Sequence, residues 1–381
     1  MRRVRDPVHG SVPLRPLEAA LLDTRPMQRL RRVRQLGLTH LVFPGAEHSR
    51  FGHSVGACHV AGRLADALVA AGWDGDVGLV RAAALLHDVG HPPFSHAGEQ
   101  GEPHERMSAR VIRETEIADV LRRFGRSAED VLGAFDPARA PVEAAIVSGQ
   151  VDADRMDYLL RDGHMCGVPY GRFDLGGLVD SLALGPDGRP AVHRAGLQAV
   201  EGLLLARYGM FLQVYFHRTR RVLDRLLEQV MPVWPDDVDA WLEWDDGRVY
   251  ELLRDDPRPA ARALRHREGI PACVAEIELS AAPARRDAAD ALARHLAEHL
   301  GVPPLVDSSA RLEAFRVGGD VRILDEDGSV YSVFEASPVL RRMDPGVEIR
   351  RIYVPREVAA EGRAIAARFR REGVQLRLFE T

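Results

Sequence analysis

A histidine–aspartate pair at the end of an apolar segment constrains this chain more than any other sequence feature. The segment LVRAAALL at residues 79–86 predicts a buried helix, and His87 and Asp88 follow it directly. Gly90 and the Pro92–Pro93 pair predict that the helix ends just beyond them. An adjacent imidazole and carboxylate can reach one divalent cation, and such a mixed site tolerates several metals. Taken alone, the pair more often marks a helix end with a capping histidine and a solvated aspartate, so further ligands must support a metal site.

Length and composition indicate a globular protein of two or three domains. The 381 residues are 46% hydrophobic and 28% charged, which is enough apolar material for a sizeable core. A formal net charge of -5 argues against a general nucleic-acid-binding role. The basic residues are all arginines, so Schiff-base and P-loop lysines are excluded, and phosphate contacts must come from arginine, histidine or backbone amides.

Cysteine usage and the first residues predict a cytoplasmic protein. Cys58, Cys166 and Cys273 are far apart and odd in number, so we expect no disulfide framework. Residues 1–7 lack the apolar stretch of a signal peptide. We also expect no membrane span, because no run of about 18 apolar residues occurs.

Periodicity predicts mainly helices up to about residue 235. Helices are expected over residues 16–22, 49–68, 79–86, 105–123, 141–148, 151–162 and 197–230, and within 126–136. A further helix, capped by Asp23 or Thr24 and reaching residue 36, would carry an arginine face among apolar residues; those arginines are Arg29, Arg31, Arg32 and Arg34. That face is either a solvated surface or an anion site.

Two of these helices carry polar stripes. Asp154, Tyr158 and Asp162 recur every four residues and share one helix face. Arg207, Phe211, Tyr215 and Arg218 share a face of the long helix in the same way. Such stripes either face water or line a cleft.

From about residue 236 the pattern changes to a smaller α+β domain. A helix over 241–253 and a hinge or loop at 255–259 come first. Strands are expected at 274–279, 321–324, 330–334 and 348–354, with helices at 284–300 and 356–373. The predicted division is therefore 1–235 for the larger domain and 236–381 for the smaller one.

Candidate metal ligands come from three separate expected helices. They are His53, the pair His87 and Asp88, and Asp154. A helical bundle gathers ligands from facing helices in this way, so separation in sequence is expected. One histidine near an apolar helix is more often structural, but the ordered set is much more specific.

Short motifs in one order carry a resemblance to a known family. They are DPVHG at residues 6–10, DTxxMQRLR at 23–31, QLG at 35–37, VFPGA at 42–46, RFxHS at 50–54, LHDxGHxPFSH at 86–96, HE at 104–105 and DxDRxDY at 152–158. Over residues 4–230 the chain resembles the HD-domain metal phosphohydrolases. Within them it is most similar to the deoxynucleoside triphosphate triphosphohydrolases, which include the animal SAM-and-HD-domain enzyme and bacterial relatives.

The resemblance implies a mainly α HD-domain bundle followed by the smaller α+β domain. It implies hydrolysis of deoxynucleoside triphosphates to deoxynucleoside and tripolyphosphate, with Mn, Mg, Fe, Ni or Zn as the divalent ion. One alternative is another HD-domain nucleotide phosphohydrolase, acting by stepwise removal of phosphate or pyrophosphate or as a phosphodiesterase. A second is a non-enzymatic nucleotide-sensing or nucleic-acid-binding protein.

Residue roles also follow from the resemblance, position by position. The metal ligands are matched by His53, His87, Asp88 and Asp154. The polar cluster beside the α-phosphate is matched by His91, His96, Glu99 and His104, with Glu99 where relatives have an aspartate. The deoxyribose contacts are matched by Gln35, Leu36, Asp162 and Tyr215, and the triphosphate contacts by Arg50, Arg155, Arg207 and Arg218, with Tyr158 as a further substrate residue. Phe211 replaces a polar residue on the cleft-facing stripe.

A regulatory site is also implied by the resemblance. Asp23, Gln28 and Arg31 match residues that read an activating guanine nucleotide at a subunit interface in the animal enzyme. The alternative is a capping aspartate with two surface residues. We therefore expect a nucleotide substrate, a guanine nucleotide effector and a homo-oligomer, dimeric or tetrameric, as partners.

Overall fold

The chain forms two compact units that interleave along the sequence. The computed structural model describes residues 2–101, 103–279, 284–309, 312–313, 320–342 and 346–370. The first unit contains 1–210, 232–249 and 316–343, and the second contains 211–231, 250–315 and 344–381. These ranges differ from the expected boundary at residue 235 because strand β8 (Arg322–Leu324) pairs with β4 (Pro190–His193) of the first unit.

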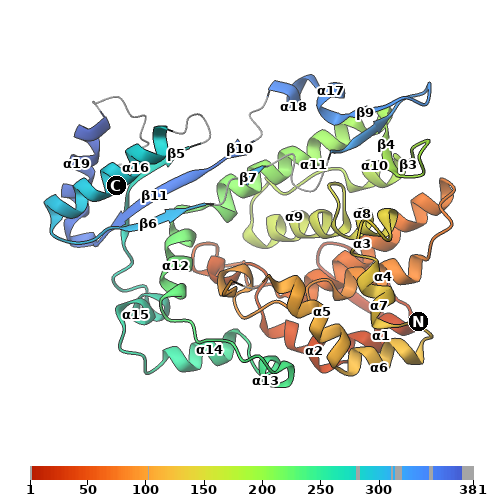
Figure 1. Cartoon of the computed structure of the whole chain (residues 1–381), viewed down its shortest axis with the longest axis horizontal. Helices are drawn as coiled ribbons and strands as arrows, with labels where there is room; N and C mark the ends of the chain where they lie inside the picture. Colours follow the sequence, from red (N-terminus) through yellow and green to blue (C-terminus); the bar gives the residue numbers. More distant parts are fainter. Residues whose placement is uncertain are drawn as a thin grey trace. The chain divides into compact units, whose positions relative to one another are not determined.

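A layer of four helices forms the centre of the first unit (Figure 1). Helix α3 (Arg50–Ala70) packs against α4 (Val77–Leu86), α8 (Pro141–Ser148) and α9 (Ala153–Cys166). Two aspartates set where these helices begin: Asp76 accepts the Leu79 N–H at 3.0 Å, and Asp152 accepts the Arg155 N–H at 2.6 Å. The starts of α4 and α9 therefore have defined positions; the start of α9 carries the candidate Asp154, whereas the candidate His87 lies at the opposite end of α4.

The first unit contains further helices outside this layer. They are α1 (Pro16–Leu22), α2 (Arg25–Arg29), α5 (His104–Glu114), α6 (Glu116–Arg123), α7 (Ala128–Gly133), α10 (Leu175–Asp180), α11 (Leu197–Met210), α13 (Val238–Leu242), α17 (Val333–Ala336) and α18 (Pro338–Arg342). Helix α14 (Asp246–Leu253) begins in this unit. Among the described helices, none is long and apolar enough to cross a membrane.

Two small sheets complete the first unit. Strands β1 (Arg2–Asp6) and β2 (Gly10–Leu14) form an antiparallel hairpin, whose turn is closed by the Asp6 carboxylate accepting the Val8 and His9 N–H groups, both at 2.9 Å. The other sheet has the order β3–β4–β8–β9, with β3 (Leu182–Leu184) and β9 (Val330–Ser332) at its edges. Its β4–β8 pair is parallel, and its other pairs are antiparallel.

The second unit contains an antiparallel sheet covered by helices. The order β5 (Ala272–Glu278), β11 (Ile349–Val354), β6 (Leu305–Ser308) forms the sheet, and β7 (Leu312–Glu313) pairs with β10 (Gly346–Val347). Its helices are α12 (Arg218–Glu228), α15 (Pro259–His266), α16 (Ala284–Leu300) and α19 (Ala359–Arg370). Val274, Ile277, Leu292 and Ile352 lie in its core. The expected fold class, mainly α with a smaller α+β part, is confirmed.

Several expected helices are interrupted. The single helix expected over 197–230 is wrong, because α11 ends at Met210, a π-helical turn spans Phe211–Tyr215, and His217 caps a new helix, α12. The helix expected over 105–123 divides at Thr115, whose hydroxyl accepts the Ile117 N–H and starts α6. The helix expected over 241–253 divides into α13 and α14.

The expected arginine-faced helix is also wrong. Its α-helical part ends at Arg29, a 3-10 turn covers Leu30–Arg32, and Val33 is extended. Thr24, not Asp23, is the N-cap, while Asp23 is the C-cap of α1. Arg29 is buried rather than solvated, because its guanidinium donates to backbone carbonyls.

In the smaller part of the chain, the remaining differences are local. The expected strand 330–334 stops at Ser332, whose hydroxyl caps α17. The expected hinge at 255–259 leads into α15, a helix that periodicity did not predict. Residues 371–373 of the expected last helix lie outside the described residues.

Candidate metal centre and histidine cluster

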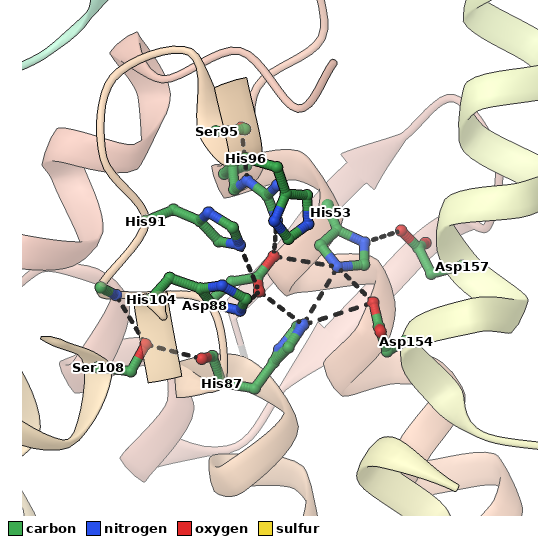
Figure 2. A network of polar contacts seen from close by, with 12 residues as sticks. His53, His87, Asp88, His91, Ser95, His96, His104, Ser108, Asp154 and Asp157 are labelled. Carbon is green, nitrogen blue, oxygen red and sulfur yellow. Dashed lines mark hydrogen bonds and ion pairs between the residues drawn. The ribbon is translucent and has the colours of Figure 1, made fainter. Parts of the chain in front are cut away.

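Two histidines and an aspartate from three helices converge in the first unit (Figure 2). His53 lies in the first turn of α3, His87 is the C-cap of α4, and Asp154 lies in the first turn of α9. The two Nε2 atoms are 3.3 Å apart, and the Asp154 Oδ1 lies 3.1 Å from His53 Nε2 and 3.5 Å from His87 Nε2. The three ligand atoms therefore surround one point, as ligands of a single ion do.

The outward-facing nitrogen of each histidine is held by a separate partner. His53 Nδ1 lies 2.8 Å from Asp157 Oδ2, and His87 Nδ1 lies 2.8 Å from the Ala84 carbonyl oxygen. Both partners are acceptors, so each Nδ1 carries a proton, and Nε2 is the nitrogen that faces the shared point and can exchange its proton for a cation. This arrangement leaves Nε2 as the ligand atom of each ring.

Asp157 is itself fixed by a buried network. Arg161 donates to both of its oxygens at 2.9 and 2.8 Å, and His9 Nε2 lies 2.7 Å from Oδ1. Arg161 also donates to Asp6 at 2.9 Å, which ties the β1–β2 turn to α9. Gly56 makes room for this network, because a Cβ there would lie 1.8 Å from the Asp157 Oδ1.

Sequence reasoning missed this network as a functional support. Asp157 and His9 appeared only inside motifs, and Arg161 and Gly56 were not singled out. One signal was present, since Asp157 and Arg161 are spaced i, i+4 with opposite charges on one helix.

The Asp88 carboxylate lies between the metal centre and a second group of histidines. Its Oδ2 is 3.5 Å from His53 Nε2, and its Oδ1 is 3.3 Å from both His87 Nε2 and His91 Nε2. Arg50, buried at the start of α3, forms an ion pair with Asp88 and donates to Ser95 Oγ at 2.8 Å. Arg50 is thus bound to a candidate ligand rather than open to solvent.

The donor set and its electrostatics fit a divalent cation. Burial acts to lower the pKa of His53, but hydrogen bonds with Asp154 and Asp157 raise it to about 10. Although burial acts in the other direction, His53 and His87 hold the pKa of the Asp154 carboxyl well below its usual range. The cluster therefore favours positive charge at its centre, and two imidazole nitrogens with carboxylate oxygens suit borderline and hard divalent ions.

The second cluster is built around one carboxylate. Glu99 Oε1 lies 2.7 Å from His104 Nδ1 and 3.1 Å from His96 Nδ1. The His91 ring stacks on the His104 ring with centroids 3.7 Å apart. His96 is the exposed member, with 63% of its side chain accessible. All four predicted residues are therefore brought together, on a loop and at the first residue of α5.

Other predicted substrate residues lie on α9, the helix of Asp154, and on α11, which packs against α9. Burial raises the pKa of Tyr158 to about 12, while the charges of Arg207 and Arg155 act to lower it. Asp162 is buried and its Oδ1 lies 2.7 Å from His48 Nε2, a partner that sequence reasoning missed.

Gln35 and Leu36 are also buried, in the first unit. Tyr215 and Arg218 belong to the second unit, at the end of the π turn and the start of α12. Their substrate contacts stay predictions.

The three predicted effector residues are partnered within the chain. Arg2 donates to both Asp23 oxygens at 2.8 and 2.7 Å. Arg31 donates to the Gln28 side chain at 2.9 Å and lies over the Phe51 ring, 3.6 Å from its centroid. Gln28 and Arg31 thus share a face, as their spacing predicts, whereas Asp23 points to the amino-terminal strand.

Two family models match this chain, and the first of them covers the metal centre and the histidine cluster. An HD domain model matches residues 50–162, and an HD associated region matches residues 173–359. A protein of Methanocaldococcus jannaschii is 38% identical over 61% of this chain and 49% of its own length. Human deoxynucleoside triphosphate triphosphohydrolase SAMHD1 is 33% identical over 44% of this chain and 34% of its own length. The chain thus spans about half or less of these relatives.

Solved structures match over nearly the whole chain. A hypothetical protein from Aquifex aeolicus is 31% identical, with a TM-score of 0.83 over 96% of this chain and 99% of its own. A phosphohydrolase from Bacteroides thetaiotaomicron is 25% identical, with a TM-score of 0.76 over 93% of this chain and 100% of its own. With its histidine and aspartate centre inside the matched domain, the chain belongs to the HD-domain phosphohydrolases, a family of hydrolases.

Proposed function

We propose that this protein hydrolyses deoxynucleoside triphosphates to deoxynucleoside and tripolyphosphate, using a divalent metal ion. The observation that carries the proposal is the convergence of His53, His87 and Asp154, with Arg155 and Arg207 close by. Similarity to SAMHD1 supports the choice of substrate. The same ligand set would also serve other nucleotide phosphohydrolases, which differ in the products they release.

The residues around the centre have separate tasks in this reaction. A divalent ion, when bound, supplies Lewis-acid polarisation of a phosphoryl oxygen and activation of water. Arg155 and Arg207 neutralise the triphosphate, and a planar guanidinium suits bidentate phosphate contacts. The exposed His96, oriented by Glu99, protonates the leaving 5′-oxygen. Attack at the α-phosphorus then breaks the bond to that oxygen and releases tripolyphosphate intact.

We expect deoxyribose to be preferred over ribose. The Gln35 side-chain oxygen is buried without a hydrogen-bond partner among the described residues, which makes it an acceptor for a sugar hydroxyl. Leu36 is buried beside it in sequence, and an apolar wall offers no partner for a 2′-hydroxyl. Equal turnover of GTP and dGTP would count against this specificity.

Product analysis tests the proposal. The purified protein is incubated with each NTP and dNTP, with Mn²⁺ or Mg²⁺, and the products are separated by ion-exchange chromatography. We expect deoxynucleoside and tripolyphosphate in equal amounts. Release of orthophosphate or pyrophosphate with a nucleotide product would instead identify another phosphohydrolase, and no turnover with any metal would leave the enzyme proposal without support.

The guanine nucleotide effector and the homo-oligomer remain part of the proposal. A nucleotide bound at Asp23, Gln28 and Arg31 would stabilise an assembled state in proportion to its differential affinity for that state. The test measures dATP hydrolysis and particle mass with and without GTP or dGTP. If neither rate nor mass responds, or if Asp23→Ala lowers the melting temperature without altering activation, the effector site is excluded.

A further inference from the structure

A buried carboxylate of the HD-associated region accepts a hydrogen bond from the loop that carries His91 and His96. Asp246 begins α14 and is 1% exposed. Its Oδ1 accepts the Phe94 N–H at 2.8 Å, and its Oδ2 accepts the Arg34 N–H at 3.1 Å. One side chain thus ties the histidine loop, defined as residues 89–98, to the segment that precedes Gln35 and Leu36.

The backbone that Asp246 holds, at Phe94 and Ser95, is conformationally strained. Phe94 and Ser95 both have left-handed backbone angles, with φ of 60° and 58°. Such angles are unfavourable for side chains with a Cβ, and two in succession persist only where surrounding contacts impose them. Gly37 packs closely against the same residue from another side, and a Cβ there would lie 2.7 Å from the Phe94 carbonyl oxygen.

Residues 241–246 also hold the histidine loop at a second point, through Arg29. The buried Arg29 donates from Nε to the Trp244 carbonyl at 2.6 Å and from Nη1 to the His91 carbonyl at 2.9 Å. Its guanidinium also lies over the Trp241 ring, 3.9 Å from the centroid. Residues 241–246 therefore hold the loop directly at Phe94 and, through Arg29, at His91.

The Phe94–Ser95 turn is connected to both clusters of the site, by hydrogen bonds to one and by direct sequence to the other. Ser95 Oγ donates to the Arg34 carbonyl at 2.6 Å and accepts from Arg50 Nε at 2.8 Å. Arg50 is the partner of Asp88. His96 is the next residue after Ser95. A displacement of the Phe94–Ser95 turn therefore moves His96 directly, whereas Asp88 is reached only through Arg50 and keeps its own contacts with His53 and His87.

We propose that Asp246 is a positioning residue for hydrolysis, which holds the strained Phe94–Ser95 turn and thereby places His96 against the substrate. The inference rests on the proposed function for its kinetic consequence. Within the described part of the chain, the Asp246 carboxylate bonds to Phe94 and Arg34 and not to the histidines or carboxylates of the metal centre, so its effect is on proton transfer geometry and not on metal binding. The HD-associated region thus completes a site whose ligands lie in the HD domain.

The test compares Asp246→Asn with Asp245→Asn. Both substitutions remove one negative charge at adjacent positions, but Asp245 pairs with Arg32 and accepts the Arg248 N–H instead of holding the loop. Amide hydrogen exchange of residues 89–98, kcat and KM for dNTP, and bound metal are measured on the full chain. For Asp246→Asn we expect exchange of the loop to rise about tenfold and kcat to fall about 10- to 100-fold, with KM and metal content unchanged.

The neighbouring variant should behave like the wild type in all four measurements. Equal exchange and equal kcat in Asp246→Asn and Asp245→Asn would overturn the inference. A loss of kcat accompanied by an equal loss of metal or by faster exchange throughout the first unit would also overturn it, because that pattern indicates a general structural role.

A second pair of variants serves if Asp246→Asn does not fold. Gly37→Ala pushes on the Phe94 carbonyl, whereas Gly125→Ala introduces the same left-handed strain at a position where a Cβ meets nothing within 4 Å. Only Gly37→Ala should increase exchange of the histidine loop, and equal loop exchange in both would overturn the inference. If the wild type hydrolyses no nucleotide, the proposed function fails. The exchange measurements still decide whether Asp246 holds the histidine loop.

Discussion

The two histidine clusters of the first unit are held in opposite ways. In the metal centre, the ligands lie at helix ends and each outward Nδ1 has its own buried acceptor. In the histidine cluster, His96 lies on a strained loop, is mostly exposed, and shares the Glu99 carboxylate with His104. The metal centre is therefore preorganised by the core, whereas the histidine cluster depends on a loop.

This difference matches the tasks proposed for the two clusters. A cation needs ligand atoms whose positions do not change, and buried hydrogen bonds to the far nitrogens supply that rigidity. A proton donor must approach a substrate that enters and leaves, so an exposed histidine on a loop is suitable. Mutations in the first cluster should therefore change metal binding, and mutations in the second should change kcat alone.

The largest effect is expected for His87→Ala. The change removes one of the two imidazole ligands, so bound metal should fall to background and hydrolysis by on the order of 1,000-fold or more, since metal activation supplies several kcal/mol. Metal analysis and turnover are measured beside circular dichroism. His164→Ala, which removes an exposed histidine near the end of α9, should change neither value. A folded His87→Ala protein with full metal and activity would disprove the ligand assignment.

Gly56→Ala should weaken the metal centre without touching a ligand. The added Cβ would lie 1.8 Å from the Asp157 Oδ1 and displace the acceptor of His53, so metal affinity should fall about 10- to 100-fold. Gly52→Ala lies one turn earlier in α3, where the added Cβ meets only an ordinary contact at 3.6 Å. Titration with Mn²⁺, followed by electron paramagnetic resonance, compares the two. Similar affinities in both variants would show that Asp157 does not control the ligand.

Glu99→Gln should slow hydrolysis without releasing metal. Because Glu99 orients His96 and His104, kcat should fall about tenfold, a part of what positioned proton transfer contributes. Burial acts to raise the pKa of Glu99, but hydrogen bonds with His104 and His96 lower it from 4.5 to about 2. The ionised carboxylate therefore stabilises the fold above about pH 4.5, and this contribution is lost as the pH falls toward 2.

Thermal melting across pH tests the direction in which the stabilisation by Glu99 changes with pH. The melting temperature of the wild type should exceed that of Glu99→Gln by a constant amount above pH 5, and the difference should shrink as the pH is lowered below about 4.5. A difference that instead grew on acidification would contradict the lowered pKa. Metal loss in Glu99→Gln would contradict the separation of the two clusters.

The sequence predicts the metal ligands better than the buried polar residues that hold the site in place. His53, His87 and Asp154 could be named because ligand residue types recur in a fixed order on predicted helices, and the structure brings them together. His48 was not named, and Arg29 was named only as part of a solvated or anion-binding face, because a buried polar residue that satisfies a distant partner has no periodic signal. Their roles depend on contacts across 114 and 215 residues of sequence.

Fold prediction failed where side chains or tertiary pairing override periodicity. The apolar repeat continues through residues 197–230, yet the His217 side chain caps a new helix and ends the register. Strand β8 was expected correctly, but its parallel partner β4 lies about 130 residues earlier and was not predicted. Local patterns thus identify elements, whereas the pairing of short strands depends on the surrounding core.

Ser108→Ala should have the smallest effect, and it tests whether the two clusters are mechanically separate. Ser108, in α5, donates to the His87 carbonyl and accepts the Gly90 N–H, both at 2.9 Å, so it joins the helix of His104 to the end of α4. Its loss leaves buried backbone groups unpaired and should lower the free energy of unfolding by about 1–2 kcal/mol. Metal content should not change, because the His87 ring is held independently by the Ala84 carbonyl.

The rate of Ser108→Ala should fall no more than about threefold, since a shift of less than 1 kcal/mol in the barrier is expected when no reacting group is removed. Ser148→Ala, at the exposed end of α8, is the control for the loss of a hydroxyl. Denaturant unfolding, metal analysis and kcat are compared in both. If Ser108→Ala lost metal and kcat together, the clusters would be one mechanical unit, and the independence of the metal centre from the histidine loop would be wrong.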